Sequence, residues 1–400
     1  FRGRPSHLAS PPPCPCRRSL LSPLRLSLPQ TSHPMRRLHF LLAALLSSSS
    51  SASFTSSSFT SSASSSSASL LPRARTRARH RVACTATPPS TSDDELVTAI
   101  SADGSISAKA LVTTRLVAEV SQCQGLGGLA AAALGRALTC SLLVAEGLKE
   151  DETFQVTFRG DGPLRGVMAT ANGKLQSRGY VGNPAVSLPP NAKGKFDVGA
   201  GVGKGTLQVV RTKMLPGEQV PSPYTSITQI RSGEIPEDIN WYLLESEQKE
   251  GALAAGVYVQ GTNTGVDLNG QEVEAAAVEA AGGWYVQLLP FASDEATAQL
   301  QANLEALASR SPSAMVREGL RPEAMLELLL DGLDMKVLKR ERPASLTESC
   351  QCSDERIKRT MRLLPRAEVP LPAFVHSPNA IRSHALRSTT LSTPRLLLYG

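Results

Sequence analysis

The stretch Thr153-Phe-Gln-Val-Thr-Phe-Arg159 decides the fold class, because its side chains alternate between apolar and polar. This period of two predicts a β-strand with one buried face. Gly160-Asp-Gly-Pro163 turns the chain into a second apolar run around Val167, and Asn172-Gly173 is a strong signal for a two-residue hairpin. With the return through Lys174–Tyr180, the sequence predicts an antiparallel meander of three strands.

Helical and strand patterns flank this meander on both sides. Before it, Lys109–Gln122 and Leu129–Glu146 are predicted to be helices, and the second is expected to be buried because Ala and Leu occupy several of its faces. After it, Ser232–Glu247 predicts a short helix, and Ala252–Gln260 and Gly283–Leu289 predict strands. These patterns indicate an α+β fold built on an antiparallel meander, with helices before and after it.

From residue 294 onward the apolar period becomes helical. Asp294–Ser309 and Pro322–Leu330 are predicted to be helices, and Lys336–Glu348 is expected to be a charged connector. Upstream, the run Gly199-Ala-Gly-Val-Gly-Lys-Gly-Thr206 lacks the Ser or Thr that follows lysine in a phosphate-binding loop. A glycine hairpin is therefore expected at this run.

Charge divides the chain into two unlike parts. The whole chain has 42 Lys and Arg residues against 35 Asp and Glu, but residues 1–92 hold 12 Arg and no acidic residue. Without this segment, 30 basic residues face 35 acidic ones, a net charge of −5. The mildly acidic remainder gives no support for a nucleic-acid partner.

The Ser- and Arg-rich segment 1–92 is typical of an organelle transit peptide. Met35 is a candidate start, which would leave residues 1–34 untranslated, and a secretory signal with the short apolar core Leu38–Leu46 is the competing interpretation. A chloroplast location is expected, with the mitochondrion as the alternative. No stretch approaches the roughly 20 apolar residues that span a bilayer, so no membrane partner is expected.

Histidine is absent from residues 81–375. Catalysis of the Ser-His-Asp or Cys-His kind, and hydrolysis at a His-bound metal, are therefore excluded from that part of the chain. We expect a protein that is not an enzyme. The six histidines are His7, His33, His39, His80, His376 and His384.

The remaining candidate chemistry is that of cysteine. Cys123 and Cys140 lie in apolar helical sequence and are expected to be buried, inert thiols. Cys350 and Cys352 lie in a polar segment, where two thiolates could form half of a zinc site, half of a redox switch, or no functional pair. A thiol-disulfide oxidoreductase is the alternative enzymatic interpretation of this pair.

Several motifs in order resemble the 33 kDa family of redox-regulated heat-shock chaperones, from about Asp94 to Leu364. The motifs that carry the resemblance are Gly160-Asp-Gly-Pro-Leu-Arg-Gly166, Arg178-Gly-Tyr180, Ser232-Gly-Glu-Ile-Pro-Glu-Asp-Ile239, Ala281-Gly-Gly-Trp-Tyr-Val-Gln-Leu-Leu-Pro290 and Cys350-Gln-Cys-Ser-Asp-Glu-Arg356.

This resemblance implies an N-terminal α+β chaperone domain over 93–293, with twisted antiparallel sheets and packed helices. It also implies a helical linker over 294–349 and the start of a small zinc and redox domain over 350–364. It implies an ATP-independent holdase that binds unfolded or oxidatively damaged client proteins and forms a homodimer when oxidised. Zinc would be bound by four cysteines in the reduced state. Cys350 and Cys352 would be both metal ligands and redox-active thiols, and oxidation would release zinc and loosen the linker.

The chain departs from the family after Leu364. The family's second pair, a Cys-x-x-Cys, is absent because no cysteine follows Cys352. A closed structural zinc site needs four ligands, so the site is incomplete here. Residues 365–400 have no periodicity and are expected to be an aberrant or disordered tail. A chaperone domain that is active without redox control is therefore the second alternative.

Overall fold

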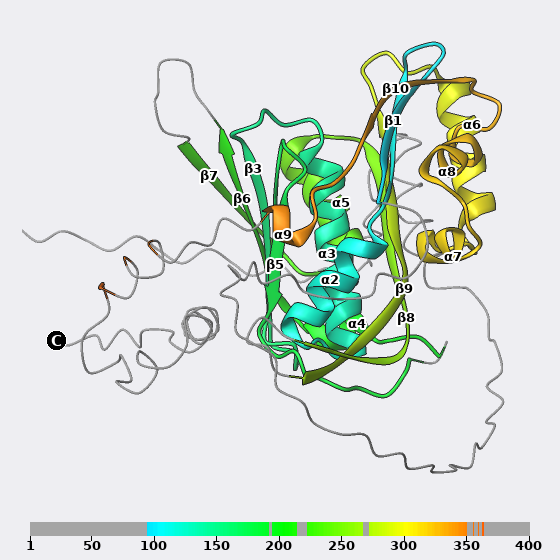
Figure 1. Ribbon diagram of the computed structural model, residues 1–400. Helices are drawn as coiled ribbons and strands as arrows, with labels where there is room; N and C mark the ends of the chain where they lie inside the picture. Colours follow the sequence, from blue (N-terminus) through cyan, green and yellow to red (C-terminus); the bar gives the residue numbers. More distant parts are fainter. Residues whose placement is uncertain are drawn as a thin grey trace, which may run out of the picture.

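The computed structural model describes residues 94–191, 194–213, 222–266 and 272–349, together with Glu355, Arg359, Arg362 and Leu363. The segments 1–92 and 365–400 lie outside the described residues. Two five-stranded sheets form the framework, and every pair of neighbouring strands is antiparallel (Figure 1). In sheet order, sheet A consists of β10 (Met335–Glu341), β1 (Leu96–Ser101), β2 (Ile106–Val112), β9 (Glu272–Leu288) and β8 (Gly251–Val266). Sheet B consists of β5 (Ser177–Val181), β4 (Val167–Asn172), β3 (Thr153–Gly160), β6 (Gly205–Lys213) and β7 (Ser222–Gln229).

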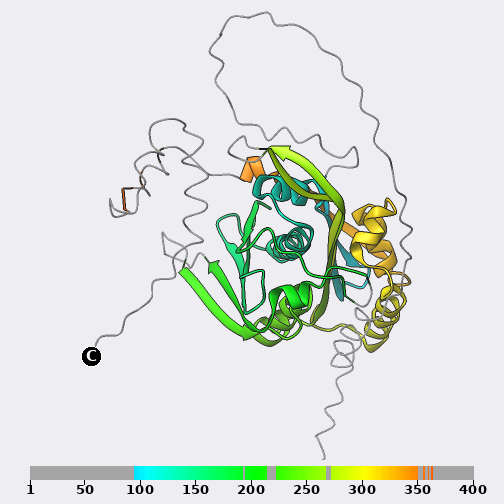
Figure 2. The same cartoon turned by 90° about the horizontal axis from the view of Figure 1, so that it is seen from below.

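The helices form two layers around these sheets. One group lies between sheet A and sheet B and consists of α2 (Thr114–Gln124), α3 (Gly128–Ala145), α4 (Val198–Val202) and α5 (Pro236–Glu247). A second group covers the outer face of sheet A and consists of α6 (Asp294–Leu307), α7 (Pro312–Arg317) and α8 (Pro322–Leu329). The short helix α9 (Leu346–Ser349) contacts α2 and β5. Seen from below, α3 lies in the centre between the two sheets (Figure 2).

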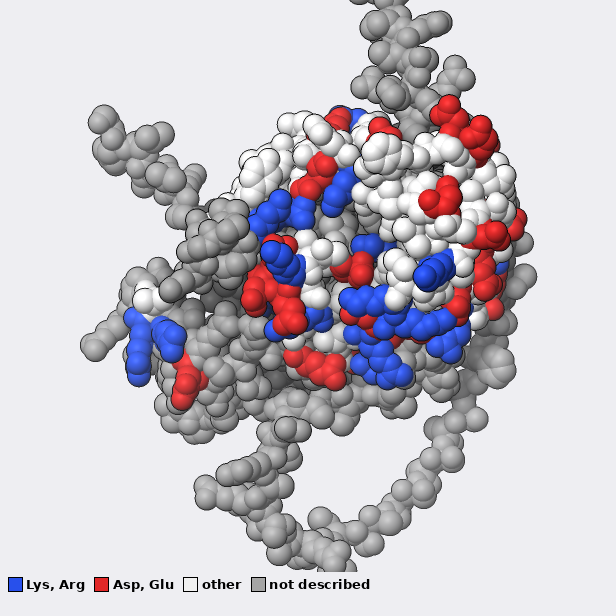
Figure 3. All heavy atoms as spheres, turned by 90° about the horizontal axis from the view of Figure 1, so that it is seen from above, with Lys and Arg blue, Asp and Glu red and all other residues white. Residues whose placement is uncertain are grey.

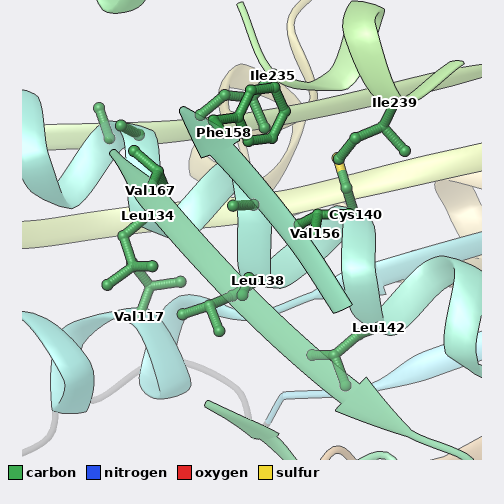
Figure 4. Close-up of a cluster of buried hydrophobic side chains, with 14 of the residues drawn as sticks. Val117, Leu134, Leu138, Cys140, Leu142, Val156, Phe158, Val167, Ile235 and Ile239 are labelled. Atoms are coloured by element: carbon green, nitrogen blue, oxygen red, sulfur yellow. The ribbon is translucent and has the colours of Figure 1, made fainter. Parts of the chain in front are cut away.

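The main core forms around α3. This helix is long and apolar enough to cross a membrane, but 89% of it is buried inside the fold, as expected of a core helix. Its side chains contact residues from both sheets and from α5, including Phe158 and Val156 of β3 and Ile239 of α5 (Figure 4). The sequence prediction of a buried helix here is confirmed.

The predicted meander is confirmed as β3, β4 and β5. Phe154, Val156 and Phe158 are fully buried, which is why the period of two identified the strand. The hairpin at Asn172 is wider than predicted, because the Asn172 N–H donates to the carbonyl of Gln176 at 3.1 Å. The Asn172 side-chain oxygen accepts from the backbone of Lys174 and Gln176 and so stabilises this longer turn.

Three other predictions were wrong in their details. The predicted helix from Lys109 begins only at Thr114, because Ile106–Val112 pairs with both β1 and β9, and sheet pairing overrides the helical preference of Ala and Leu. The predicted glycine hairpin is the short helix α4, whose N-cap Asp197 accepts from the Ala200 N–H at 2.8 Å. The charged connector contains strand β10, which pairs with β1.

Candidate functional site

The candidate site is the outer face of sheet A, which the segment 294–341 covers. This face and the helices above it form a second hydrophobic cluster, separate from the α3 core. The sheet contributes Val97, Ala99, Ile106, Ala108, Ala110, Ala252, Ala254, Trp284 and Val286. The covering helices contribute Ala296, Leu300, Leu304, Met315, Met325, Leu326, Leu329 and Leu330. If the helices left, the sheet would expose a continuous apolar surface.

Helix α8 supplies the most completely buried part of the cover. Pro322 occupies the first turn, where its missing N–H costs nothing, and Met325, Leu326 and Leu329 are 0% exposed. Burying one such side chain contributes about 1.5–3 kcal/mol. Apolar burial is therefore the main force that keeps α8 on the sheet.

Helix α7 approaches the sheet closely because glycines lie beneath it. A Cβ on Gly256 would lie 2.7 Å from the Ser313 Oγ, and one on Gly282 would lie 2.9 Å from Val316 Cγ2. The Cβ on Gly282 would also lie 2.7 Å from the backbone carbonyl oxygen of Leu111. Gly282 in the motif Ala281-Gly-Gly-Trp284 thus admits both a neighbouring strand and the covering helix.

A polar contact joins the covering helices to one another. Asn303 of α6 is 8% exposed, and its amide donates to the carbonyls of Leu329 at 3.1 Å and Asp331 at 2.8 Å. These carbonyls at the end of α8 need partners outside the helix. Asn303 therefore makes α6 and α8 one packed unit.

Ion pairs at the rim add a weaker attachment. Glu95, which precedes β1, meets Arg321 at 2.7 Å and Arg340 at 3.7 Å, and Arg340 also meets Glu323 at 2.5 Å. The two arginine side chains are 69% and 46% exposed, so solvent screens these pairs and their contribution to stability is small. In the view from above, acidic and basic side chains lie close together on the surface of the described residues (Figure 3).

After α8 the chain returns to the main core. Strand β10 pairs with β1, the Ala344 N–H donates to the Leu175 carbonyl at 3.1 Å, and the Leu346 N–H donates to the Glu119 carboxylate at 2.9 Å. Leu346 begins α9 and packs against the α3 core. No sequence pattern identifies Glu95 or Glu119 as partners, because both contacts depend on segments far apart in the chain.

Cys350 and Cys352 lie outside the described residues, although Cys350 directly follows α9. Cys123 and Cys140 are buried, as predicted, and burial raises the pKa of the Cys140 thiol far above its usual value. Within the described ranges no group of three or more His, Cys, Asp and Glu side chains is arranged to hold a metal ion. The fully buried Cys140 lies inside the α3 core.

The acidic pair Glu237-Asp238 has a structural role. The Asp238 carboxylate, on a residue only 2% exposed, accepts from the backbone N–H groups of Arg231 at 2.7 Å, Ser232 at 3.1 Å and Gly233 at 2.8 Å. Ile235 in the same turn has a φ of 72°, which is unusual for a β-branched residue. Asp238 therefore fixes the strained entry to α5, and the motif 232–239 stabilises the fold.

Comparison with known proteins identifies the family. The family model described as Hsp33 protein matches residues 94–371. This chain belongs to the Hsp33 family. The 33 kDa chaperonin of Symbiobacterium thermophilum is 41% identical over 277 residues, which cover 69% of this chain and 86% of that protein. The 33 kDa chaperonin of Nostoc sp. is 39% identical over 279 residues, covering 69% and 85%.

A solved relative has the same fold. The crystal structure of the 33 kDa chaperonin (heat shock protein 33 homolog) from Thermotoga maritima matches with a TM-score of 0.59 and 30% identity, covering 69% of this chain and 87% of that one. The Hsp33 match begins at Asp94, where the resemblance in the sequence begins, and ends seven residues beyond Leu364. Family membership supports a chaperone connected with heat stress, and the family name gives no indication of an enzyme.

Proposed function

We propose that this chain is an ATP-independent holdase whose apolar client-binding surface is the outer face of sheet A. The observation that carries the proposal is the separate hydrophobic cluster between that face and α6, α7 and α8. A surface that is apolar, continuous and covered by one segment of the same chain can be concealed and exposed without unfolding the α3 core. Unfolded client proteins expose apolar side chains that such a surface would bind.

Redox control would act through the segment that follows α8. Cys350 comes directly after α9 in the chain. The segment just before α9 donates a hydrogen bond from the Ala344 N–H to the Leu175 carbonyl, and β10 before it pairs with β1 at the edge of sheet A. Oxidation of Cys350 and Cys352 would change the chain at that point and weaken the attachment of α9. Loss of the contact between Leu346 and Glu119 would then free β10 and the covering helices.

The cover has contacts of its own that do not involve cysteine. Met325, Leu326 and Leu329 are fully buried on the sheet, and Asn303 joins α6 to α8. These contacts favour a resting state in which α6, α7 and α8 cover sheet A, even with an incomplete zinc site. We therefore expect regulation to persist in part, rather than a chaperone domain that is permanently active.

The direct experiment is suppression of aggregation by the full chain without ATP. A heat-denatured client such as citrate synthase is heated with the reduced protein and with protein treated with peroxide. We expect weak suppression by the reduced form and stronger suppression after oxidation. Absence of suppression in both states would overturn the holdase proposal, and equal suppression would favour the chaperone domain without redox control.

The rival oxidoreductase interpretation is tested with the double variant Cys350→Ser, Cys352→Ser. If these thiols catalysed disulfide exchange, the unmodified protein would reduce or isomerise a scrambled disulfide substrate and the variant would not. We expect no turnover by either protein, together with loss of the peroxide response in the variant.

A further inference from the structure

Strand β7 is the open edge of sheet B. In the part of the chain that the structure describes, sheet B ends at β7, which pairs with β6 along its whole length of eight residues. Among the described residues its other side carries no further strand, and Figure 1 shows it at the margin of the molecule, away from α6, α7 and α8. Removal of the cover from sheet A would therefore leave this edge unchanged.

The direction of the backbone groups along β7 follows from one hydrogen bond. The Ile230 N–H donates to the Gly205 carbonyl at 2.9 Å, so the main-chain groups of Ile230 face β6. Because N–H and C=O groups alternate sides along a strand, the main-chain groups of Thr225, Ile227 and Gln229 face outward. Pro223 also faces outward, where its missing N–H removes no hydrogen bond to β6.

The β7 edge carries no charged side chain, and Pro223 near its start is its one residue of a type that blocks pairing with another strand. Exposed edges are commonly blocked by charged side chains, above all lysine, but Ser222-Pro-Tyr-Thr-Ser-Ile-Thr-Gln229 contains no charge. By contrast, β10 at an edge of sheet A carries Lys336, Lys339 and Arg340. The strand β8, which is also uncharged, is contacted by α5 and α7.

Two exposed apolar side chains flank the β7 edge on opposite faces of the sheet. Ser226 lies 3.3 Å from Ser246 of α5, measured between the two Oγ atoms, so even-numbered positions face α5 and odd-numbered positions face solvent. Tyr224 on the first face is 57% exposed, and Ile227 on the second is 65% exposed. A strand added to this edge would contact an apolar side chain on each face.

We propose that β7 binds an extended, uncharged segment of an unfolded polypeptide by adding it as a sixth strand to sheet B. This inference rests on the proposed holdase function and extends it to a second type of contact. Main-chain N–H and C=O groups are common to all unfolded proteins, so an edge that pairs with them is independent of client sequence. The outer face of sheet A would bind apolar side chains, whereas β7 would bind the backbone.

The test uses the full chain and a fluorescent ten-residue peptide of alternating Thr and Val, with binding measured by anisotropy. Thr225→Pro removes one outward N–H without removing a bond to β6, and Ile227→Lys places a charge at the edge. Thr225→Pro is expected to bind the peptide about tenfold more weakly, which is the factor for one main-chain hydrogen bond. Ile227→Lys is expected to weaken peptide binding to a similar degree. A peptide N-methylated at alternate residues on one edge should lose affinity for the unmodified protein to a similar degree.

The matched control is Gln208→Lys, which places the same charge on the same outer face but one strand inside the edge, directly opposite Ile227. It should keep the affinity of the unmodified protein. Circular dichroism and thermal unfolding of all three variants establish that each is folded. If Gln208→Lys weakens binding as strongly as Ile227→Lys, the face rather than the edge binds the peptide and the proposal is overturned.

The remaining outcomes separate this proposal from the holdase function. Binding unaffected by Thr225→Pro and Ile227→Lys, or no binding by the unmodified protein, overturns the edge proposal while aggregation suppression can still succeed. Edge-dependent peptide binding without aggregation suppression overturns only the holdase function. If sedimentation shows a dimer that Ile227→Lys dissociates while peptide affinity is unchanged, the occupant is a second copy of the chain, and the proposal is wrong.

Discussion

At the scale of single residues, two buried carboxylates accept backbone N–H groups at the starts of helices. Asp238 accepts three backbone N–H groups at the entry to α5, and Asp94 accepts the N–H groups of Arg115 at 2.9 Å and Leu116 at 2.8 Å at the start of α2. Both satisfy backbone donors that no helix or sheet could satisfy. Neither carboxylate belongs to the hydrophobic cluster under α6, α7 and α8, so substitutions here should change stability rather than client binding.

Asp238→Ala should lower the free energy of unfolding by about 3 kcal/mol, because it leaves buried N–H groups without an acceptor. Asp197→Ala is the matched control, since Asp197 accepts a single N–H at the start of α4 and should cost about 1 kcal/mol. Urea unfolding followed by circular dichroism measures both. Equal losses in the two variants would contradict the role assigned to Asp238.

Asp94 should make stability depend on pH. Burial raises the pKa of Asp94 to about 6 from its usual 3.8, and the hydrogen bonds from Leu116 and Arg115 oppose this rise. The folded protein therefore holds this proton more tightly than the unfolded chain. The resulting stabilisation is full below the unfolded pKa of 3.8 and is lost as the pH rises through 6.

Asp94→Asn removes this titration while keeping a side-chain oxygen as an acceptor. The stability of the variant relative to the unmodified protein should therefore increase between about pH 4 and pH 6 and remain constant above that range. Urea unfolding at several pH values measures the difference. A difference that does not change with pH would show that Asp94 does not titrate in this range.

At the scale of elements, the cover of sheet A should be held by apolar burial rather than by charge. Leu326→Ala is expected to weaken the attachment of α8 by about 3 kcal/mol, whereas Glu95→Gln should weaken it by less than about 1 kcal/mol. Hydrogen exchange of the α8 amides should accelerate about a hundredfold in the first variant and about fivefold at most in the second. The opposite order would make the ion pairs the principal attachment.

The sequence predicted the elements whose own pattern is strong. Strand β3 shows a full alternation, α3 is apolar on several faces, and α5 buries Ile239, Tyr242 and Leu243 at helical spacing. Prediction from the sequence failed where pairing with another strand decides the structure. β10 is rich in charge because it lies at a sheet edge, and β8 extends through the turn-like residues Thr262–Gly265 because β9 pairs with them.

At the scale of the whole molecule, sheet A separates two hydrophobic clusters. One surrounds α3 and maintains the fold, and the other lies under α6, α7 and α8 and can be exposed while the first stays intact. The family and its α+β class could be recognised from ordered motifs such as Gly160–Gly166. The location of the concealed surface could not, because it forms only when α8 packs against β1 and β2, which lie far from it in the chain.

The most direct test of the concealed surface is aggregation of a heat-denatured client in the presence of Leu326→Glu without any oxidant. A buried charge should detach α8, which faster exchange of the α8 amides would establish, and Glu327→Gln on the exposed side of α8 is the control. We predict that Leu326→Glu suppresses aggregation without peroxide, whereas the reduced unmodified protein and Glu327→Gln do so only weakly. A variant with α8 detached and no gain in suppression would contradict the assignment of sheet A's outer face as the client-binding surface.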